Sequence, residues 1–339
     1  MNNAHCLVTG ASGFIGRRLT EVLAESGKQV ACLVRRSSAV EALQALPVRL
    51  CRGDVATGEG LDDALEGIDV VYHLAGTIRA LRSQQYHDVN AEGVRRILKA
   101  CARRSTPPIF VLVSSIAVAG PSTIGVPVNE DDPPRPVSEY GRSKLAGEAA
   151  AREFADRVPT TIVRPSIVFG AGDLFTLQWF HSIARFGVHP TPCARAHLFS
   201  LIHIDDLVAL LRAAAERGDR IPSANERTAN GRGVYFAAFP GELTYRQVGV
   251  EIASAMGSDV PWTPRVPLFA FGTYALFCEA VGRVIGRPPW IGLDKFREAR
   301  AGSWICRSDA AERLKVAFPE PLATRFRETA EGYRRLGLL

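Results

Sequence analysis

Residues 9–16 read Thr9-Gly10-Ala11-Ser12-Gly13-Phe14-Ile15-Gly16, directly after the apolar run Cys6-Leu7-Val8 and before a helical pattern that continues to about Ser26. Glycines at 10, 13 and 16 permit a tight turn and a close approach of the backbone to a phosphate group. The free N–H groups at the start of the following helix favour an anion. The stretch therefore predicts an α/β fold whose first turn holds the pyrophosphate of a dinucleotide.

Further apolar runs of strand length follow at 30–34, 48–51, 70–74 and 109–113, with a long helical stretch from Tyr86 to Arg104 between the last two. Continuous apolar runs separated by helices are typical of a parallel sheet that is covered on both faces. We therefore predict a Rossmann-type, doubly wound parallel α/β sheet.

Beyond about Phe169 the alternation weakens, and Pro and Gly cluster at 186–195, 218–233 and 286–292. This change predicts a smaller C-terminal substrate-binding part. We assign 1–170 to the dinucleotide-binding domain, with 200–240 returning to it, and 171–199 and 241–339 to the smaller part.

The composition of the 339-residue chain is that of a globular protein, with 47% hydrophobic and 22% charged residues. The net charge of +6 is spread along the chain without a basic block, so we predict no nucleic-acid partner. The seven cysteines include no C-x-x-C pair, which favours reduced thiols. Because the glycine loop begins at Thr9, it leaves no room for a cleavable leader, and we expect a cytoplasmic protein.

The chemistry is predicted from Tyr140-Gly141-Arg142-Ser143-Lys144, which places a phenol and an ammonium four residues apart. On a helix these side chains share one face. A free phenol has a pKa of about 10, and a neighbouring cation favours the phenolate. Tyr140 is then able to exchange a proton with a carbonyl or carbinol while a nicotinamide exchanges a hydride. Ser115 follows the strand at 109–113, at the edge where open α/β sheets bind ligands, and completes the predicted catalytic set.

These motifs resemble the extended short-chain dehydrogenases of the NAD-dependent epimerase/dehydratase superfamily. TGASGFIG resembles their T-G-x-x-G-[FY]-[IL]-G fingerprint, and Tyr140 and Lys144 match their Y-x-x-x-K pair. SSIAVAGP at 114–121 is similar to the corresponding part of 3β-hydroxysteroid dehydrogenases. The likeness covers about the first 210 residues. It implies that Ser115 holds the substrate oxygen and that Lys144 also binds the nicotinamide ribose.

The resemblance implies further cofactor contacts. The segment at 53–55 is similar to the family's adenine-contacting segment, that at 73–76 to its H-x-A-[AG] turn, and that at 164–170 to the segment beside the nicotinamide. The cofactor-binding residues that we predict are Gly10, Ser12, Gly13, Phe14, Ile15, Gly16, Arg35, Arg36, Asp54, Val55, Leu74, Ala75, Gly76, Tyr140, Lys144, Pro165 and Ile167.

The end of the second strand bears on the choice of cofactor. It reads Val34-Arg35-Arg36-Ser37-Ser38, with no carboxylate in reach. NAD-dependent enzymes need an acidic residue there for the ribose 2′-hydroxyl, whereas NADP-dependent enzymes place arginine there. We predict NADP, with NAD and merely solvated arginines as the alternative.

Two other segments contain residues for which we considered a metal-binding or structural role. His203-Ile204-Asp205-Asp206 suggests a metal, but we favour Asp205 as the cap of a helix that continues through Arg212, and we predict no metal site. Asn90, in the helix after the fourth strand, is expected to support the site structurally.

Three functions compete. The first is interconversion of a secondary alcohol and a ketone on a lipophilic substrate, sterol-like or with an acyl chain. The second is epimerisation or dehydration of a nucleotide-linked sugar, and the third is a non-catalytic cofactor-binding scaffold. Nucleotide-sugar enzymes of the family usually carry an arginine shortly before their H-[VI]-x-D motif, and the corresponding segment 199–203 has none. Arg185 or Arg195 would be the alternative cation. We favour the first function.

The C-terminal part supports the same choice. Residues 268–286 are a long apolar helix candidate, and Glu279, Arg283 and internal glycines argue against a membrane span. Three roles for this helix remain open: it packs on the smaller part, forms a pocket wall or contacts a membrane surface. A homodimer also remains open. We expect the lipophilic pocket to draw, with few fixed charges, on some of these aromatic residues: Trp179, Phe180, Phe186, Trp262, Phe269, Phe271, Tyr274, Phe277 and Trp290.

Overall fold

The apolar runs of the first half form one seven-stranded sheet in a computed structural model that describes residues 5–123, 125–192, 197–223 and 231–339. Cys193 and Arg195 lie outside these ranges. The strands are β1 (His5–Thr9), β2 (Gln29–Val34), β3 (Val48–Arg52), β4 (Val70–His73), β5 (Ile109–Val113), β6 (Thr160–Pro165) and β11 (Val234–Ala237). Their order is β11-β6-β5-β4-β1-β2-β3, and all neighbours are parallel. The predicted doubly wound sheet is confirmed.

The interior strand β1 is buried on both faces, which explains its continuous apolar sequence. Cys6 and Val8 belong to the core beneath α1 (Phe14–Glu25) and α8 (Ile204–Arg217). Leu7, between them, belongs to the opposite core, beneath α5 (Glu92–Ala102). Since side chains alternate along a strand, a strand covered by helices on both sides needs apolar residues at every position.

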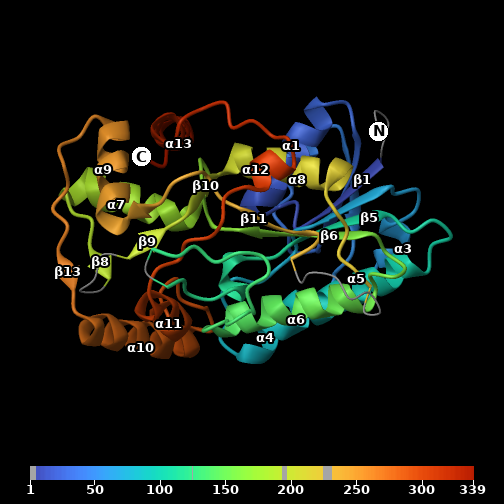
Figure 1. Ribbon diagram of the computed structural model, residues 1–339, viewed down its shortest axis with the longest axis horizontal. Coiled ribbons are helices and arrows are strands. Elements are labelled where there is room, and N and C mark those ends of the chain that lie inside the picture. Colours follow the sequence, from blue (N-terminus) through green and yellow to red (C-terminus); the bar gives the residue numbers. More distant parts are fainter. Residues whose placement is uncertain (1–4, 124, 193–196, 224–230) are drawn as a thin grey trace.

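Helices cover the two faces of this sheet (Figure 1). One face carries α1, α8 and α12 (Ala310–Arg313), and the other carries α3 (Leu61–Ala64), α4 (Ser83–Asn90), α5 and α6 (Glu139–Glu153). Two short elements, α2 (Glu41–Gln44) and the 3₁₀ helix η1 (Ile116–Val118), follow β2 and β5.

The helix expected from Tyr86 to Arg104 is two helices, α4 and α5, which are separated at Ala91. The break lies where α6 crosses closely. A Cβ added at Gly147 of α6 would lie 2.2 Å from the Asn90 carbonyl oxygen. The hydrophobic pattern continues through Ala91 because both helices bury the same kind of face, so the sequence carries no sign of the break.

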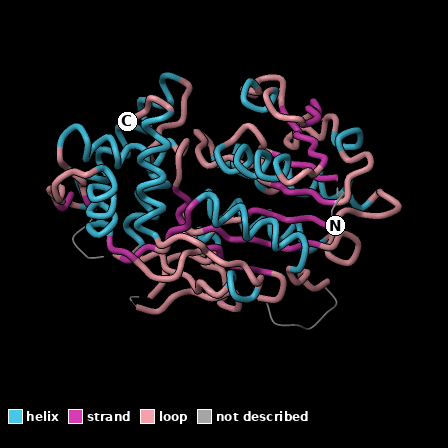
Figure 2. Tube along the Cα trace, turned by 90° about the horizontal axis from the view of Figure 1, so that it is seen from above, coloured by secondary structure: helices cyan, strands magenta, loops and turns pink. Residues whose placement is uncertain are grey.

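A helical group and a hairpin of helices lie outside the two layers that cover the sheet. α7 (Leu174–Phe186), α9 (Tyr245–Met256) and α13 (Leu322–Arg335) pack around Phe180, Phe326 and Tyr333. Figure 2 shows this group at the end of the molecule that also holds the C-terminus. α10 (Leu268–Ile285) and α11 (Leu293–Ala301) lie along the lower edge in Figure 1.

In the described residues, three short strand pairs lie outside the seven-stranded sheet. They are β7 (Ile167–Phe169) with β10 (Leu201–His203), β9 (Leu198–Phe199) with β12 (Leu243–Thr244), and β8 (Thr191–Pro192) with β13 (Arg265–Val266). Downstream of α11 the chain returns to the sheet, where Ala310 and Leu314 join the core beneath α8.

Candidate active site

The glycine loop lies where the strand order reverses between β1 and β4, the position at which open α/β sheets bind dinucleotides. Gly10 has a φ of +70°, and a Cβ there would lie 2.7 Å from the Ala75 nitrogen. A Cβ at Gly16 would lie 2.1 Å from the Gly10 oxygen. Gly13 begins α1 without a side-chain cap, which leaves the N-terminal turn open to an anion. These backbone features fit a pyrophosphate.

The turn after β4 is held against this loop by hydrogen bonds. Thr9 Oγ1 accepts from the Ala75 N–H (3.1 Å) and contacts His73 Nδ1 (3.0 Å). Burial, together with the Lys144 cation, lowers the pKa of His73 to about 3, so its ring is neutral. Leu74, Ala75 and Gly76 are thereby fixed beside the glycine loop, where the resemblance implies cofactor contacts.

Asn90 joins this turn to α6. Its Oδ1 accepts from the Thr77 N–H (2.8 Å), and its Nδ2 donates to the Thr77 carbonyl and to Ser143 Oγ (both 2.9 Å). Asn90 is fully buried. It therefore positions the turn after β4 relative to the helix that carries Tyr140 and Lys144, which is the structural support that its place in the sequence suggests.

The ends of β2 and β3 lie side by side at the expected adenosine end of the loop. The Arg35 carbonyl accepts from Arg52 (3.1 Å). The Arg36 side chain is 91% exposed and lies 3.7 Å from Glu59. After β3, Asp54 Oδ1 accepts from the Ala56 N–H (2.8 Å), which fixes the turn that contains Val55. Arg36 thus has an acidic neighbour in this conformation that would compete with a 2′-phosphate.

Ser115 and Tyr140 meet at the carboxyl edge of β5. Ser115 caps η1 by accepting from the Ala117 N–H (3.1 Å), and Ser138 caps α6 by accepting from the Gly141 N–H (3.0 Å). Burial raises the pKa of Tyr140, while a hydrogen bond from Ser115 and the field of Lys295 lower it. The pair thus has the arrangement needed to place a carbonyl oxygen between two hydroxyl groups.

Lys144 shares α6 with Tyr140, but its ammonium is held at the end of β5. Its Nζ donates to the Val113 carbonyl (2.6 Å), and burial lowers its pKa to about 8, against the opposing field of Glu148. A Cβ at Gly76 would lie 3.8 Å from this Nζ. Lys144 therefore faces the turn after β4, which is compatible with the contact to the nicotinamide ribose that the resemblance implies.

A buried ion pair holds the strand ends beneath the site. Arg164 of β6 donates to both carboxylate oxygens of Glu148 (2.9 and 2.7 Å), and Ser114 Oγ donates to the same group (2.6 Å). Burial opposes ionisation of Glu148, but the Arg164 guanidinium outweighs it and lowers the pKa of that carboxyl. The network ties α6 to β5 and β6. Pro165 is the last residue of β6, and Ile167 is the first residue of β7.

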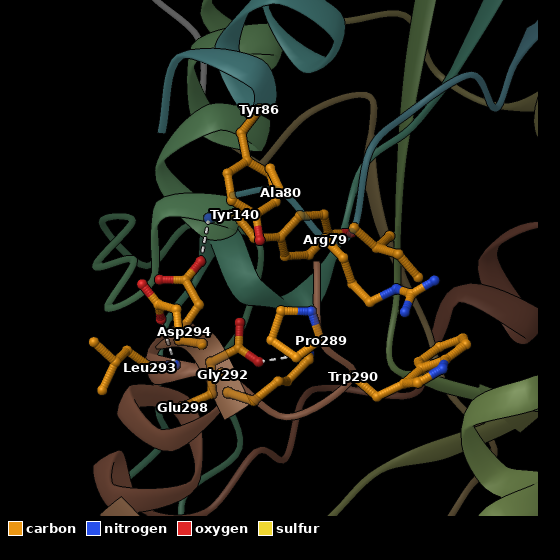
Figure 3. A pocket seen from close by; sticks show the side chains of 13 residues that line it. Arg79, Ala80, Tyr86, Tyr140, Pro289, Trp290, Gly292, Leu293, Asp294 and Glu298 are labelled. Atoms are coloured by element: carbon orange, nitrogen blue, oxygen red, sulfur yellow. Dashed lines mark hydrogen bonds and ion pairs between the residues drawn. The ribbon is translucent and has the colours of Figure 1, made fainter. Parts of the chain in front are cut away.

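Tyr140 opens on a pocket whose far wall is the α10–α11 hairpin (Figure 3). Tyr86 lies beside it, with ring centroids 6.3 Å apart, and Pro289, Trp290 and Leu293 line the opposite side. The cavity measures about 40 Å³, which is room for only a few water molecules. A substrate therefore needs the hairpin to move away from Tyr140.

The expectation of an apolar pocket with few charges is wrong for this pocket. Its charged lining residues are Arg79, Glu279, Asp294, Lys295 and Glu298. Of the nine aromatic candidates only Trp290 lines it, with the Arg79 guanidinium 3.5 Å from its ring centroid. Phe180 is core, while Phe186, Trp262, Phe269, Tyr274 and Phe277 are exposed. Composition identified the aromatic residues but not which of them face inward.

Three residues of α11 that the sequence analysis missed act on the start of α6, two through hydrogen bonds and one through its charge. Asp294 accepts from the N–H groups of Glu139 and Tyr140 (both 3.0 Å), and Glu298 accepts from Ser138 Oγ (2.7 Å). Lys295 donates to Glu298 (2.7 Å), and its ammonium is the cation whose field reaches Tyr140. The stretch LDKFREAR resembles a solvated helix face, so nothing local in the sequence marks these residues.

The segment at 203–206 differs from its prediction. His203, not Asp205, caps α8, by accepting from the Asp205 N–H at 3.4 Å. Asp205 lies in the first turn and pairs with Arg18 (2.6 Å). Ligand atoms of His203, Asp205 and Glu328 lie within 4.8 Å of one another, but Arg325 pairs with Glu328 (2.9 Å). Guanidinium groups already neutralise these carboxylates, so the cluster supports no metal proposal.

A family model and individual relatives both match this chain. The model described as "NAD dependent epimerase/dehydratase family" matches residues 6–227. A ceramide reductase of Caulobacter vibrioides is 31% identical over 335 residues, covering 98% of this chain and 95% of that protein. The 3 beta-hydroxysteroid dehydrogenase type 7 of Mus musculus is 31% identical over 202 residues, covering 53% of this chain and 54% of that protein.

Solved structures share the fold. MoeE5 in complex with UDP-glucose and NAD superimposes with a TM-score of 0.72 at 25% identity, covering 98% of this chain and 99% of that one. The similarities thus include proteins named for lipid and steroid reactions and one solved with a nucleotide sugar.

Proposed function

Because the chain belongs to the NAD-dependent epimerase/dehydratase family, we propose that it is an NADP-dependent oxidoreductase that interconverts a ketone and a secondary alcohol on an acyl-chain lipid. The observation that carries the proposal is the Ser115–Tyr140 pair, which opens on a pocket walled by the C-terminal hairpin. An inert scaffold has no need of this arrangement.

The reaction divides between the residues of the site. A nicotinamide cofactor held by the glycine loop would supply a hydride for the carbonyl carbon. Tyr140 donates its phenolic proton to the carbonyl oxygen, and Ser115 donates a hydrogen bond to the same oxygen. The resulting phenolate takes a proton from water to complete the turnover. Lys144, held at Val113, faces the cofactor turn and would orient the ribose. In the oxidative direction each transfer reverses.

The choice of an amphiphilic lipid rests on the two kinds of surface in the pocket. Pro289, Trp290 and Leu293 offer apolar contact, whereas Arg79 and Lys295 offer charge and hydrogen-bond donors. A lipid with a polar group next to its ketone matches both, which a plain sterol does not. The similarity to a ceramide reductase over nearly the whole of both chains supports the same class.

A nucleotide sugar is the second candidate, since Arg79 and Lys295 are also suitable for a diphosphate. The strands β9 and β10 argue against it. The segment from Phe199 to His203 has no arginine, and Leu201 and Ile202 are buried in the core. Arg185, the alternative cation among the described residues, is exposed and lies over the Phe186 ring.

The test is turnover by the purified protein with NADPH and with NADH, followed by nicotinamide absorbance. We expect oxidation of NADPH by an N-acyl lipid that carries a 3-oxo group, and none by UDP-sugars. Micromolar binding of UDP, with no oxidation of NADPH by the lipid, would put the nucleotide-sugar function first.

We also propose a cytoplasmic location. Its support is chemical: Cys32, Cys51, Cys101, Cys278 and Cys306 are free thiols. Fractionation of cells that express a tagged chain tests this, and recovery from an oxidising compartment would contradict it.

A further inference from the structure

One face of α10 is apolar and exposed. Phe269, Leu276, Phe277 and Val284, which we call the outward face, are 79%, 57%, 65% and 87% exposed. Their spacings of seven and eight residues, about two helical turns, place them on one side of a helix. The buried residues of α10 are Ala275 and Gly282. An aromatic and aliphatic stripe of this kind marks an interaction site.

The opposite side of α10 supports the active-site wall. Phe271 packs on Phe296 of α11, with ring centroids 5.9 Å apart. Glu279 accepts from the Leu293 N–H (3.1 Å) and lines the pocket at Tyr140. The outward face and the pocket are thus two sides of the same hairpin, so whatever covers the first lies next to the second.

The charges around the hairpin have a consistent arrangement. Residues 260–303 contain six Arg or Lys and three Asp or Glu. The three acids, Glu279, Asp294 and Glu298, are engaged in the hydrogen bonds to α6 and α11 already described. Arg265 and Arg287, at the two ends of α10, are exposed. The exposed side therefore combines apolar side chains with positive charge at both ends.

By length and composition α10 is able to cross a membrane, with a mean hydropathy of 1.4. A spanning helix would have to leave α11, and Glu279 and Arg283 would enter hydrocarbon. A helix that lies in the interface keeps its inner side on the protein and needs only one apolar face.

We propose that the outward face of α10 lies in the headgroup region of an anionic bilayer and that the lipid substrate enters the pocket from that surface past the hairpin. The proposal identifies the partner of the proposed function and, for substrate delivery, rests on it. The charge at both ends of α10 favours an anionic surface over a second copy of this chain, which would bring the same arginines together.

The binding test uses vesicle flotation with the full chain, comparing phosphatidylcholine alone with an equal mixture of phosphatidylcholine and phosphatidylglycerol. We expect binding to the mixture that weakens with salt. Leu276→Glu should lower the bound fraction by about tenfold or more. Leu336→Glu is the matched control, because Leu336 directly follows α13 and is 49% exposed. Helix α13 and helix α10 lie at opposite edges of the molecule in Figure 1. Leu336→Glu should bind like the wild type. Arg265→Glu with Arg287→Glu should weaken binding to the mixture alone.

Turnover distinguishes docking from the reaction itself. Leu276→Glu should retain kcat/KM for a short-chain, water-soluble ketone while losing turnover of the same group in vesicles. Thermal melting shows that each variant is folded. A wild type that stays unbound with both vesicles overturns the proposal, as does a dimer that Leu276→Glu converts to a monomer. Vesicle binding without any ketone reduction would leave docking standing and overturn the proposed function.

Discussion

At the scale of single residues, Tyr140 carries the most direct prediction. Tyr140→Phe removes the proton donor and little else, because the ring contact with Tyr86 remains. We expect kcat to fall by about 10²–10⁴-fold. The dissociation constant for NADPH, measured by fluorescence titration, should change little. A variant that keeps more than a tenth of wild-type activity would exclude Tyr140 as the acid.

Lys295 is predicted to set the pH range of Tyr140. Its ammonium lowers the pKa of a phenol that burial otherwise raises. Lys295→Met should therefore raise that pKa, and the rising limb of the alcohol-oxidation pH profile, which follows phenolate formation, should move to higher pH. Lys295→Arg, which keeps the charge, should restore the wild-type position. If the pH profile of Lys295→Met equals that of the wild type, Lys295 does not influence the pKa of Tyr140.

Sequence patterns were informative for the residues close to the sheet and not for those on α11. Gly10, Ser115, Tyr140 and Lys144 lie in short motifs whose spacing is fixed by one strand, turn or helix. Lys295 reaches Tyr140 across 155 residues of sequence, through a hairpin whose position depends on tertiary packing. No local periodicity reports a contact of that kind.

At the scale of elements, the loop after β2 is expected to decide between NADPH and NADH. A 2′-phosphate beside Arg35 and Arg36 gains charge-assisted hydrogen bonds. NADPH should bind more tightly than NADH, and Arg35→Asp should narrow or reverse the preference. Since Glu59 competes for Arg36, Glu59→Gln should strengthen NADPH binding modestly. Equal dissociation constants for both cofactors in the wild type would refute the preference.

The contact between α6 and β6 predicts a pH-dependent stability. The pKa of Glu148 is lowered in the folded state from its ordinary value of 4.5. Its ion pair with Arg164 therefore stabilises the fold fully at pH values above 4.5. This contribution is lost as the pH falls through the lower pKa that Glu148 has in the folded state.

Arg164→Met leaves a buried carboxylate unpaired and should cost about 3–5 kcal/mol in the free energy of unfolding near neutral pH. Denaturant unfolding measures this. The double variant with Glu148→Gln should recover part of the loss, whereas a single variant as stable as the wild type would show that the pair is dispensable.

Element boundaries followed the hydrophobic pattern where one helix covers one face of the sheet, as in α1. The hydrophobic pattern did not predict the helix break at Ala91. This break depends on the close packing of α6 at Gly147, which arises only when the helices assemble. The pattern also could not reveal that α10 exposes its aromatic residues, since an apolar helix reads the same whether it faces a core or a surface.

At the scale of the whole molecule, the hairpin of α10 and α11 should act as a movable cover. The cavity of about 40 Å³ at Tyr140 is far smaller than the roughly 300–1,000 Å³ of ordinary ligand sites. Binding of a lipid with NADPH must therefore separate α11 from α6, where Asp294 and Glu298 now hold them together.

Hydrogen exchange measured by mass spectrometry should change in 286–301 at saturating lipid and stay constant in α5. Asp294→Ala, which removes the acceptor for two N–H groups of α6, should speed exchange in 293–301 without any ligand. If lipid binds at saturation and 286–301 exchanges at an unchanged rate, the substrate enters by another route and the hairpin is a fixed wall.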